Sequence, residues 1–457
     1  MEHLEEVLRS AQKLAEEAEV FSVSSRATSI QFEANELKQV QTKESSSTAL
    51  RIFRDGRVGF ATVTGMGEEG EKSSPSPDLS RQGRGTLGDL VDMAVETSEF
   101  GSPASFQFPS RRDYSAVSIF DPKVQEIAME RMVEIGKELT ARIEGHTPDI
   151  LCDVQVNKGT SSISFTNSQG GEGKYDKSLL SLSLEGILVR DTDMLFVGDS
   201  ESSCRPDSID IDGLANRVIW QLEMAKKKAA VSTKLLPVIF TPLGVASALL
   251  SPLVLAFNGK SVVEGASPLK DKLGEQVFDK RLSLWDDATI AYGVGSYPFD
   301  AEGVSGQRLP LVTNGIVTNF LYDLQTAALA GTQSTGNGQR AGGGFPRPDI
   351  SSLILSGGDV SFQAMVEDMK EGLIVEQLMG AEQGNLLGGD FGGNVLLGYK
   401  VENGEIVGRV KDTMIAGNVY QVLKELLGIG QEARWVGGIL QTPPFYCSHV
   451  SVATKGK

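Results

Sequence analysis

The sequence predicts an α+β fold of two domains, with helices packed on mostly antiparallel sheets. Apolar residues recur with helical spacing in some stretches and alternate with polar residues in others. Asp-Gly and Asn-Gly pairs between alternating runs predict tight hairpins. The amino-acid composition changes near residue 230. The chain has 51 glycines, which is above the usual share, and most of the additional glycines lie beyond this residue. We therefore expect an α+β domain at 1–230 and a Gly-rich, strand-dominated domain at 231–457.

The N-terminal half begins with an amphipathic helix over residues 2–18, in which Leu4, Val7 and Leu8 share one face. The clearest hairpin joins Thr48–Phe53 to Val58–Thr64 around Asp55-Gly56. Short strands are expected before it, at Glu19–Ser25, Ser29–Ala34 and Leu37–Thr42.

A polar segment rich in Gly, Ser and Pro, residues 67–85, predicts a mobile loop. Thr86 and Asp89 indicate the cap of a helix that ends near Glu99. After an irregular segment at Ser102–Ala116, Asp121-Pro122 opens a long helix through about Ile143.

From Leu151 the period changes to two, which predicts an antiparallel meander. A helix follows over Gly213–Ala230, and its three lysines at 226–228 are explained by the helix dipole and by solvation. The strands of the meander are expected at Leu151–Asn157, Ser161–Asn167 and Leu179–Arg190.

The C-terminal half opens with a buried strand over Leu235–Phe240. Thr241 and Pro242 then predict the cap and first position of a helix, and Ser251-Pro252 indicates a kink or restart. The helix is apolar on nearly every face and should be buried. It contains no His, Cys, Asp or Glu before Val263.

Further along, Gly-rich turns separate short strands. Asn314-Gly315 and Asn403-Gly404 predict two hairpins, and residues 331–349 predict a long loop without structure of its own. Helices are expected at Ser361–Gly372 and Asn418–Leu427, and closing strands at Trp435–Gln441 and Tyr446–Ala453.

Composition excludes several classes of protein. The chain has 457 residues and a formal charge of −17, which disfavours direct binding of nucleic acid. No apolar run reaches the length of a membrane span, and the acidic N-terminus has no apolar signal region. Cys152, Cys204 and Cys447 show no CxxC spacing and predict reduced thiols. We expect a cytoplasmic protein.

The densest local signal is the stretch Gly384–Gly398, GNLLGGDFGGNVLLG. Glycine removes the side-chain barrier, so a ligand can approach the main chain closely. Alternatively, these glycines only allow tight bends in a curved sheet. On the first interpretation an extended peptide adds as a strand in a cleft. The residues that would line this cleft are Gly388, Gly389, Asp390, Gly392 and Gly393.

Other candidates carry less specific signals. Cys447 and His449 lie two positions apart in a strand, so both would face one side as metal ligands, but a tetrahedral site needs further ligands. Arg340 and Arg347 in the long loop, and Arg308 beside it, either grip a carboxylate or are solvated.

Three blocks resemble the TldD/PmbA family, named modulators of DNA gyrase. They are RIFRDGRVGFATVTG at 51–65, STGNGQR at 334–340 and GRVKDTMIAGNVYQVL at 408–423. The resemblance extends over essentially the whole chain. It implies a peptidase system in which TldD-like members carry a His-Glu-x-x-x-His zinc motif, on the helix after the first C-terminal strand, and a downstream Cys ligand. The PmbA branch, also called TldE, lacks this motif and pairs with TldD.

This chain departs from the zinc motif at every ligand position. The motif window falls near Leu250–Leu255, where Leu250 and Leu255 take the two His positions and Ser251 the Glu position. Leucine cannot bind zinc, and Ser251 is no general base without a partner. The ending, ARWVGGILQTPPFYCSHVSV, also resembles the PmbA branch, so the resemblance does not identify Cys447 as the family's zinc ligand.

The resemblance therefore implies a cofactor-free PmbA/TldE-type subunit of a peptidase complex acting on unstructured or modified peptides. Zinc is expected only on a TldD-type partner. A homodimer that holds extended peptides without cutting them remains an alternative, as does a hydrolase with unrecognised metal-free chemistry.

Overall fold

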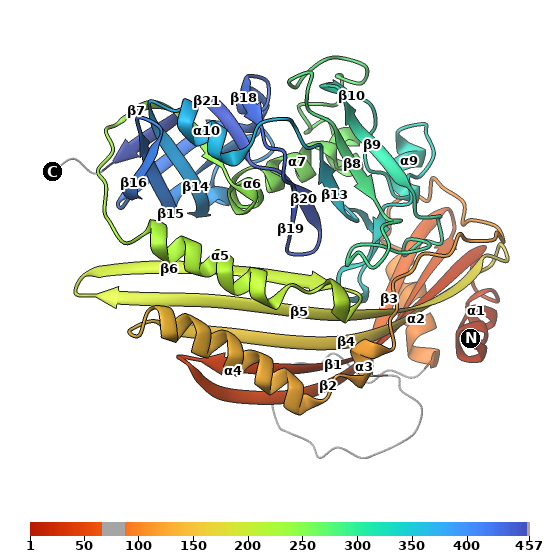
Figure 1. Cartoon of the computed structure of the whole chain (residues 1–457). Coiled ribbons are helices and arrows are strands. Elements are labelled where there is room, and N and C mark those ends of the chain that lie inside the picture. Colours follow the sequence, from red (N-terminus) through yellow and green to blue (C-terminus); the bar gives the residue numbers. More distant parts are fainter. Residues whose placement is uncertain (66–86, 455–457) are drawn as a thin grey trace.

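The computed structural model describes residues 1–65 and 87–454, so the loop predicted at 67–85 and the cap at Thr86 lie outside the described residues. Figure 1 shows an N-terminal layer of long strands lined by helices and a C-terminal part stacked on it. This architecture confirms the α+β class. None of the helices in the described ranges has the length and apolar character needed to cross a membrane.

The N-terminal half forms one antiparallel sheet in the order β3-β2-β1-β4-β5-β6. Asp55 and Gly56 both have positive φ and close the predicted β2–β3 hairpin. The strands are β1 (Glu17–Glu33), β2 (Glu36–Arg54), β3 (Arg57–Thr64), β4 (Leu151–Asn167), β5 (Glu172–Arg190) and β6 (Asp193–Ser203).

These strands are longer than the sequence predicts. Each of β1, β2 and β4 joins two expected short strands, and β5 and β6 extend the meander further. Ser and Thr side chains bridge the polar middle of the sheet, as between Ser25 and Ser45 (Oγ–Oγ 2.8 Å) and between Thr28 and Thr42 (3.0 Å). The main-chain ladder needs no apolar side chains, so polar residues interrupt the hydrophobic pattern without ending the strand.

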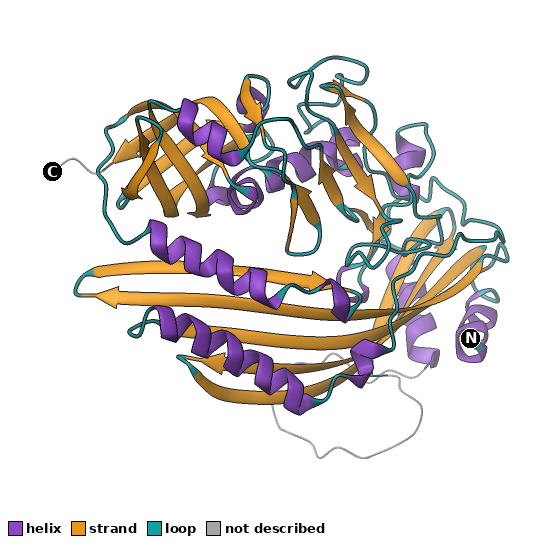
Figure 2. Cartoon of the chain, in the orientation of Figure 1, coloured by secondary structure: helices purple, strands orange, loops and turns teal. Residues whose placement is uncertain are grey.

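Helices lie along this sheet (Figure 2). Helices α4 and α5 pack against each other and against β4 and β6, whereas α1 and α2 cover the other end near β3. The bounds are α1 (Glu2–Ala11), α2 (Leu87–Ser98), α3 (Lys123–Glu126), α4 (Met129–His146), the 3-10 turn η1 (Pro206–Ser208) and α5 (Ile211–Met224).

Three helix predictions are wrong in extent. The first helix ends at Ala11, because the chain enters β1 at Glu17. The helix expected from Asp121 breaks at the extended residue Ile127, whose carbonyl accepts from Lys158 Nζ at 2.5 Å. Helix α5 ends at Met224, before the lysines at 226–228, so these lysines do not interact with its dipole as predicted. Instead, Lys226 forms an ion pair with Glu223, and Lys228 forms one with Asp193.

The C-terminal half contains a closed barrel. The strands follow the path β14-β7-β21-β17-β15, and pairing of β14 with β15 closes it, with β16 and β18 attached. The Asn403-Gly404 turn joins β15 to β16 as predicted. The strands are β7 (Lys234–Phe240), β14 (Glu371–Met379), β15 (Asp390–Glu402), β16 (Glu405–Arg409), β17 (Thr413–Asn418), β18 (Leu426–Ile429) and β21 (Phe445–Thr454).

A second sheet, β10-β9-β8-β13-β20-β19, lies beside the barrel. Its strands are β8 (Leu284–Asp287), β9 (Arg308–Thr313), β10 (Ile316–Val317), β13 (Leu353–Leu355), β19 (Arg434–Val436) and β20 (Leu440–Thr442), and a small pair is formed by β11 (Gly338–Gln339) and β12 (Arg347–Pro348). The helices are α6 (Pro242–Ala248), α7 (Leu250–Phe257), α8 (Gly259–Val263), α9 (Leu324–Leu329), α10 (Phe362–Asp368) and α11 (Val419–Val422), with 3-10 turns η2 (Ala341–Gly343) and η3 (Ala381–Gln383).

Several C-terminal predictions change in detail. The strand expected at Trp435–Gln441 is a hairpin, because Gly437 and Gly438 both take positive φ and reverse the chain. The loop at 331–349 is not structureless, since β11, η2 and β12 occupy it. The helix expected at Asn418–Leu427 is the short α11, and Gly372 belongs to β14 rather than to the preceding helix.

The two halves share a buried core. One apolar cluster combines Val218 and Leu222 of α5 with Ile239, Ile374 and Tyr446 on the barrel. The chain passes between the halves from Met224 to Lys234. Each half also has an apolar cluster of its own, one within Leu4–Ala94 and one within Val231–Val452, so the division into domains at residue 230 stays a prediction.

Candidate functional site

The strand–helix unit at the start of the C-terminal half is formed as the sequence predicts. Thr241 caps α6 by accepting from the N–H of Gly244 at 3.3 Å, and Pro242 takes the first helical position. A second helix, α7, restarts at Leu250 and buries Leu253 and Phe257 in the barrel core. This unit therefore presents a helix where the resemblance places a zinc motif.

The side chains on α7 do not fit a zinc ion. Leu250 and Leu255 offer no donor atoms, and Ser251 Oγ donates to Glu382 Oε1 of η3 at 2.5 Å. No group of three or more His, Cys, Asp or Glu in the described ranges is arranged to hold a metal ion. Helix α7 therefore offers no set of ligands for a zinc ion.

Cys447 and His449 do not face one side, so that expectation is wrong. A β-bulge between Cys447 and Val450 shifts the register of β21 against β7. Cys447 is fully buried, and burial raises the pKa of its thiol. His449 is exposed, and its Nδ1 lies 2.9 Å from Ser448 Oγ.

The Gly-rich stretch lies at the start of β15. Gly388 and Gly389 precede the strand, Asp390 begins it, and Asp390 Oδ1 accepts from Asn418 Nδ2 at 2.9 Å. Gly389 has φ +87°, and a Cβ there would lie 2.3 Å from the ring of Tyr420. The backbone at Gly389 thus has the strained-turn geometry of the curvature interpretation.

One edge of this stretch is paired, and the chain also comes close to Gly393. Asp390–Asn394 pairs with β17 on one side. On the other side, a Cβ at Gly393 would lie 2.6 Å from the carbonyl oxygen of Met379 and 3.1 Å from the N atom of Ala381. Strand addition needs an unpaired edge, and β14 pairs with β15 only from Asn394 onward. A peptide cleft lined by Gly388, Gly389, Asp390, Gly392 and Gly393 therefore stays a prediction.

Of the arginines singled out in the sequence, Arg340 is not solvated. Its side chain is 1% exposed, and Nη2 donates to Glu19 Oε1 on β1 of the N-terminal half. Arg347 is exposed, and Arg308 lies over the ring of Trp285 at 4.9 Å. The structure brings Arg340 alone of these three into a buried site.

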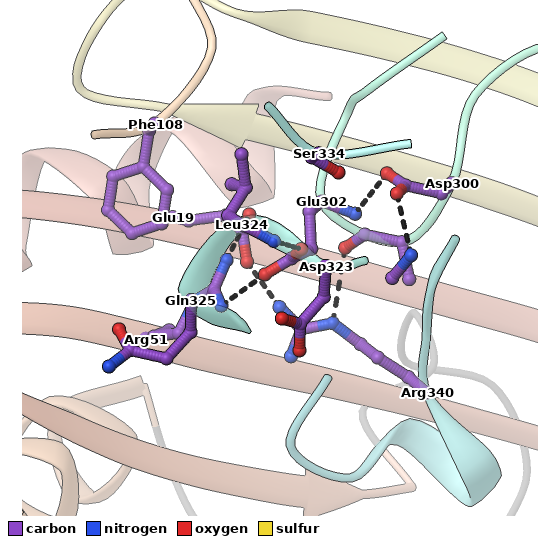
Figure 3. Close-up of polar contacts among 12 residues, drawn as sticks. Glu19, Arg51, Phe108, Asp300, Glu302, Asp323, Leu324, Gln325, Ser334 and Arg340 are labelled. Atoms are coloured by element: carbon purple, nitrogen blue, oxygen red, sulfur yellow. Dashed lines mark hydrogen bonds and ion pairs between the residues drawn. The ribbon is translucent and has the colours of Figure 1, made fainter. Parts of the chain in front are cut away.

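Arg340 belongs to a buried ion network with Glu19, Arg51 and Glu302 (Figure 3). Arg51 Nη1 lies 2.5 Å from Glu302 Oε1, and Nη2 lies 3.0 Å from Glu19 Oε2. The other oxygen of Glu302 accepts from the N–H of Leu324, the first residue of α9, at 2.7 Å. The network therefore connects β1 and β2 to the C-terminal half.

The electrostatics of the network follow from its burial. Burial alone would lower the pKa of Arg51, but the charges of Glu19 and Glu302 raise it above its ordinary value. Burial lowers the pKa of Arg340 to about 10, so it stays charged near neutral pH. The guanidinium of Arg51 also lies 4.8 Å from the ring centroid of Phe106, a cation–π contact.

Further carboxyl groups surround the network. Burial, with Glu302 nearby, raises the pKa of Asp300 well above its ordinary value and that of Asp323 to about 6. Asp300 accepts from the N–H groups of Glu302, Val304 and Gly338 at 2.8–2.9 Å. Asp323 caps α9 by accepting from Thr326 N–H at 2.7 Å. These hydrogen bonds fix the turns that hold Glu302. We therefore interpret the network as a contact that holds the two halves of the chain together.

A second polar cluster joins the halves between β6, α5 and β19. Asp199 of β6 lies 2.5 Å from Arg217 Nε and 3.2 Å from Arg434 Nη2 of β19. Glu376 lies beside it on a bulge of β14 and is 5% exposed. Burial raises the pKa of Glu376 to about 7, and Arg434 offsets only part of the rise.

The raised pKa of Glu376 predicts a pH-dependent stability. Because its folded pKa of about 7 exceeds the ordinary value of 4.5, the folded state holds this proton more tightly than the unfolded state. The contribution is present below pH 4.5 and is lost as the pH rises through 7. Relative to wild type, Glu376→Gln should therefore gain about 2–3 kcal/mol of unfolding free energy across this window. Urea unfolding at several pH values measures the difference, and parallel stability curves would contradict it.

The structure defines an α+β protein in which buried ion pairs join a long antiparallel sheet to a closed barrel, and in which helix α7 presents no His, Cys, Asp or Glu. Residues 18–96 match the pattern described as PmbA/TldA metallopeptidase domain 1, and residues 233–454 match that of the PmbA/TldA metallopeptidase C-terminal domain. The chain belongs to the PmbA/TldD family.

Relatives and solved structures agree with this assignment. The chain is 28% identical over 451 residues to Metalloprotease PmbA of Escherichia coli O157:H7, covering 94% of this chain and 91% of that protein. It is 26% identical over 437 residues to a metalloprotease of Methanothermobacter thermautotrophicus, covering 95% and 92%. The crystal structure of TldE from Thermococcus kodakarensis has the same fold, with a TM-score of 0.85, 22% identity, and coverage of 98% of this chain and 99% of that chain.

Proposed function

We propose that this chain is the metal-free, PmbA/TldE-type subunit of a cytoplasmic peptidase complex that acts on unstructured or modified peptides. The observation that carries the proposal is α7, which keeps its place after β7 but has Leu250, Ser251 and Leu255 at the motif positions. Such a helix can support a fold and an interface but cannot activate water through zinc. Catalysis would reside on a TldD-type partner with a complete motif.

Purification from the native host tests the partner. A stoichiometric second chain with a His-Glu-x-x-x-His motif supports the proposal. A lone homodimer that binds peptides contradicts it and favours a non-catalytic binding module. A monomer or homodimer that cleaves peptides by itself favours a hydrolase with other chemistry.

We expect the purified chain to hold no stoichiometric zinc. A stable site needs three or four ligands in fixed geometry, and α7 supplies none. Elemental analysis after purification in zinc-replete medium is the measurement, with the Cys447→Ala and His449→Ala variants as matched controls. One zinc per chain that disappears in either variant would contradict this expectation.

We also expect negligible peptidase activity from the isolated chain and restored activity with the partner. Amide hydrolysis needs an activated nucleophile or water, which the described residues of α7 do not supply. The assay follows cleavage of unstructured peptides by the chain, the partner and their mixture. Chelator should abolish the activity of the mixture. Activity of the chain alone that resists chelator and further purification would be the contrary result.

A further inference from the structure

The outer edge of β5 is open over its first residues. β4 pairs with β5 from Glu172 onward, whereas β6 pairs with it only from Leu180. The N–H of Ser178 points outward and donates to the carbonyl of Ile119 at 3.0 Å. Main-chain groups repeat with a period of two along a strand, so those of Lys174 and Asp176 point outward as well. No described residue forms a hydrogen bond with them.

Residues 109–119 form a loop that runs beside this open edge. Near one end the carbonyl of Pro109 accepts from Asn167 Nδ2 at 2.9 Å, and at the other Ile119 meets β5. Between these contacts lies a groove of about 470 Å³, lined by residues 111–117, by Glu172, Lys174 and Tyr175 of β5, and by Pro298 and Phe299. Lys174 thus places unpaired main-chain groups in the wall of the groove, and Asp176 continues the open edge beyond it.

The base of the groove is aromatic. The ring of Phe299, from the C-terminal half, lies 4.6 Å from that of Tyr114 and 4.9 Å from that of Tyr175. Tyr114 donates its hydroxyl hydrogen to the carbonyl of Gly303 at 2.8 Å, which fixes the ring. Phe299 is buried beneath the two half-buried tyrosines, whose rings give a rigid surface against which side chains of an extended chain can pack.

The lining is cationic although the protein is acidic. Arg111, Arg112 and Lys174 line the groove with the carboxylates of Asp113 and Glu172. Arg111 is already paired with Glu172 at 3.6 Å. Arg112 and Lys174 have no ion-pair partner in the part of the chain that the structure describes. Asp176 adds a carboxylate further along the open edge, so the positive excess is confined to Arg112 and Lys174, which favour an anionic group at that part of the groove.

We propose that this groove binds an extended, acidic peptide segment by strand addition to β5. The outward N–H and C=O groups of Lys174 and Asp176 would form the ladder, and Arg112 and Lys174 would attract the carboxylates. From Glu172 to Asp176 the edge is roughly 14 Å long, at about 3.4 Å per residue. The inference rests on the proposed peptide substrate and adds a binding site that uses no residue of α6 or α7.

Binding to the full-length isolated chain tests the proposal with three fluorescent peptides of equal length. The first alternates Val and Asp, the second alternates Val and Lys, and the third repeats the first with every second amide N-methylated. We expect the Val–Asp peptide to bind, and both other peptides to bind at least about tenfold more weakly in anisotropy titrations. An N-methyl group removes the ladder donor and leaves the side-chain charges unchanged, so it separates strand addition from charge attraction.

Variants and hydrogen exchange locate the site. Asp176→Pro removes one outward N–H and should weaken binding at least about fivefold relative to Asp176→Ala. The double variant Arg112→Gln/Lys174→Gln should weaken binding of the Val–Asp peptide but not that of a Val–Ser peptide. If the proline variant fails to fold, amide hydrogen exchange in the wild-type chain still tests the proposal. Saturating peptide should protect the amides of Lys174 and Asp176 from exchange.

Three results would overturn the proposal. They are no binding of any peptide, equal binding of the N-methylated peptide, and binding without protection of these amides. Because the experiment uses neither a partner nor catalysis, its failure is distinct from failure of the peptidase proposal. A chain that binds peptide but recruits no TldD-type subunit would retain this site and lose the proposed complex.

Discussion

Replacing Arg51 with Met is expected to lower the free energy of unfolding by about 3–5 kcal/mol. The substitution keeps an apolar stem of similar length but leaves Glu302 without its 2.5 Å partner and Glu19 without its 3.0 Å partner. The three side chains are 0% exposed, so water cannot replace the lost cation. Removing one member of a buried ion cluster costs far more than removing an exposed pair, because the remaining charges stay desolvated.

Arg26→Met is the matched control. Arg26 lies on the neighbouring strand β1 and pairs with Glu44 at 3.3 Å, but both side chains are 71% exposed. The cost of this change should stay within about 1 kcal/mol. Urea unfolding of both variants provides the comparison. Equal destabilisation by the two substitutions would mean that the buried network does not fasten the halves together.

The second large effect concerns the Gly-rich stretch. Gly389→Ala should destabilise the fold by about 2–4 kcal/mol, since it adds the strain of φ +87° to an overlap with the ring of Tyr420. Gly392→Ala in the same stretch should change stability by less than about 1 kcal/mol. There φ is not in the left-handed region, and the added Cβ meets Ala416 Cβ at an ordinary 3.5 Å.

Thermal and urea unfolding of this glycine pair separate the two interpretations of the stretch. A destabilised Gly389 variant beside a stable Gly392 variant indicates a tight turn into β15. If instead Gly389→Ala keeps full stability and blocks partner-dependent cleavage, the residues line a peptide cleft. That result would contradict the expectation stated above.

Local signals in the sequence determined the elements nearest the motif position. The apolar run at Leu235–Phe240, the Thr241-Pro242 start and the Ser251-Pro252 restart predicted β7, α6 and α7, because caps and proline act on their immediate neighbours. The Asp55-Gly56 and Asn403-Gly404 hairpins were predicted for the same reason. The absence of ligands at Leu250, Ser251 and Leu255 follows from residue identity alone.

Only the tertiary structure decided which charged residues are buried. Arg51 shares its face of β2 with Ala49 and Phe53, and only its charge predicts an exposed side chain, yet Glu302 of the C-terminal half buries it. Arg51 and Glu302 are 251 residues apart, and Arg340 reaches Glu19 across 321. The closure of the barrel and the open edge of β5 likewise depend on which distant strands meet. Local periodicity reports which residues share a face, whereas burial depends on what packs against that face from elsewhere in the chain.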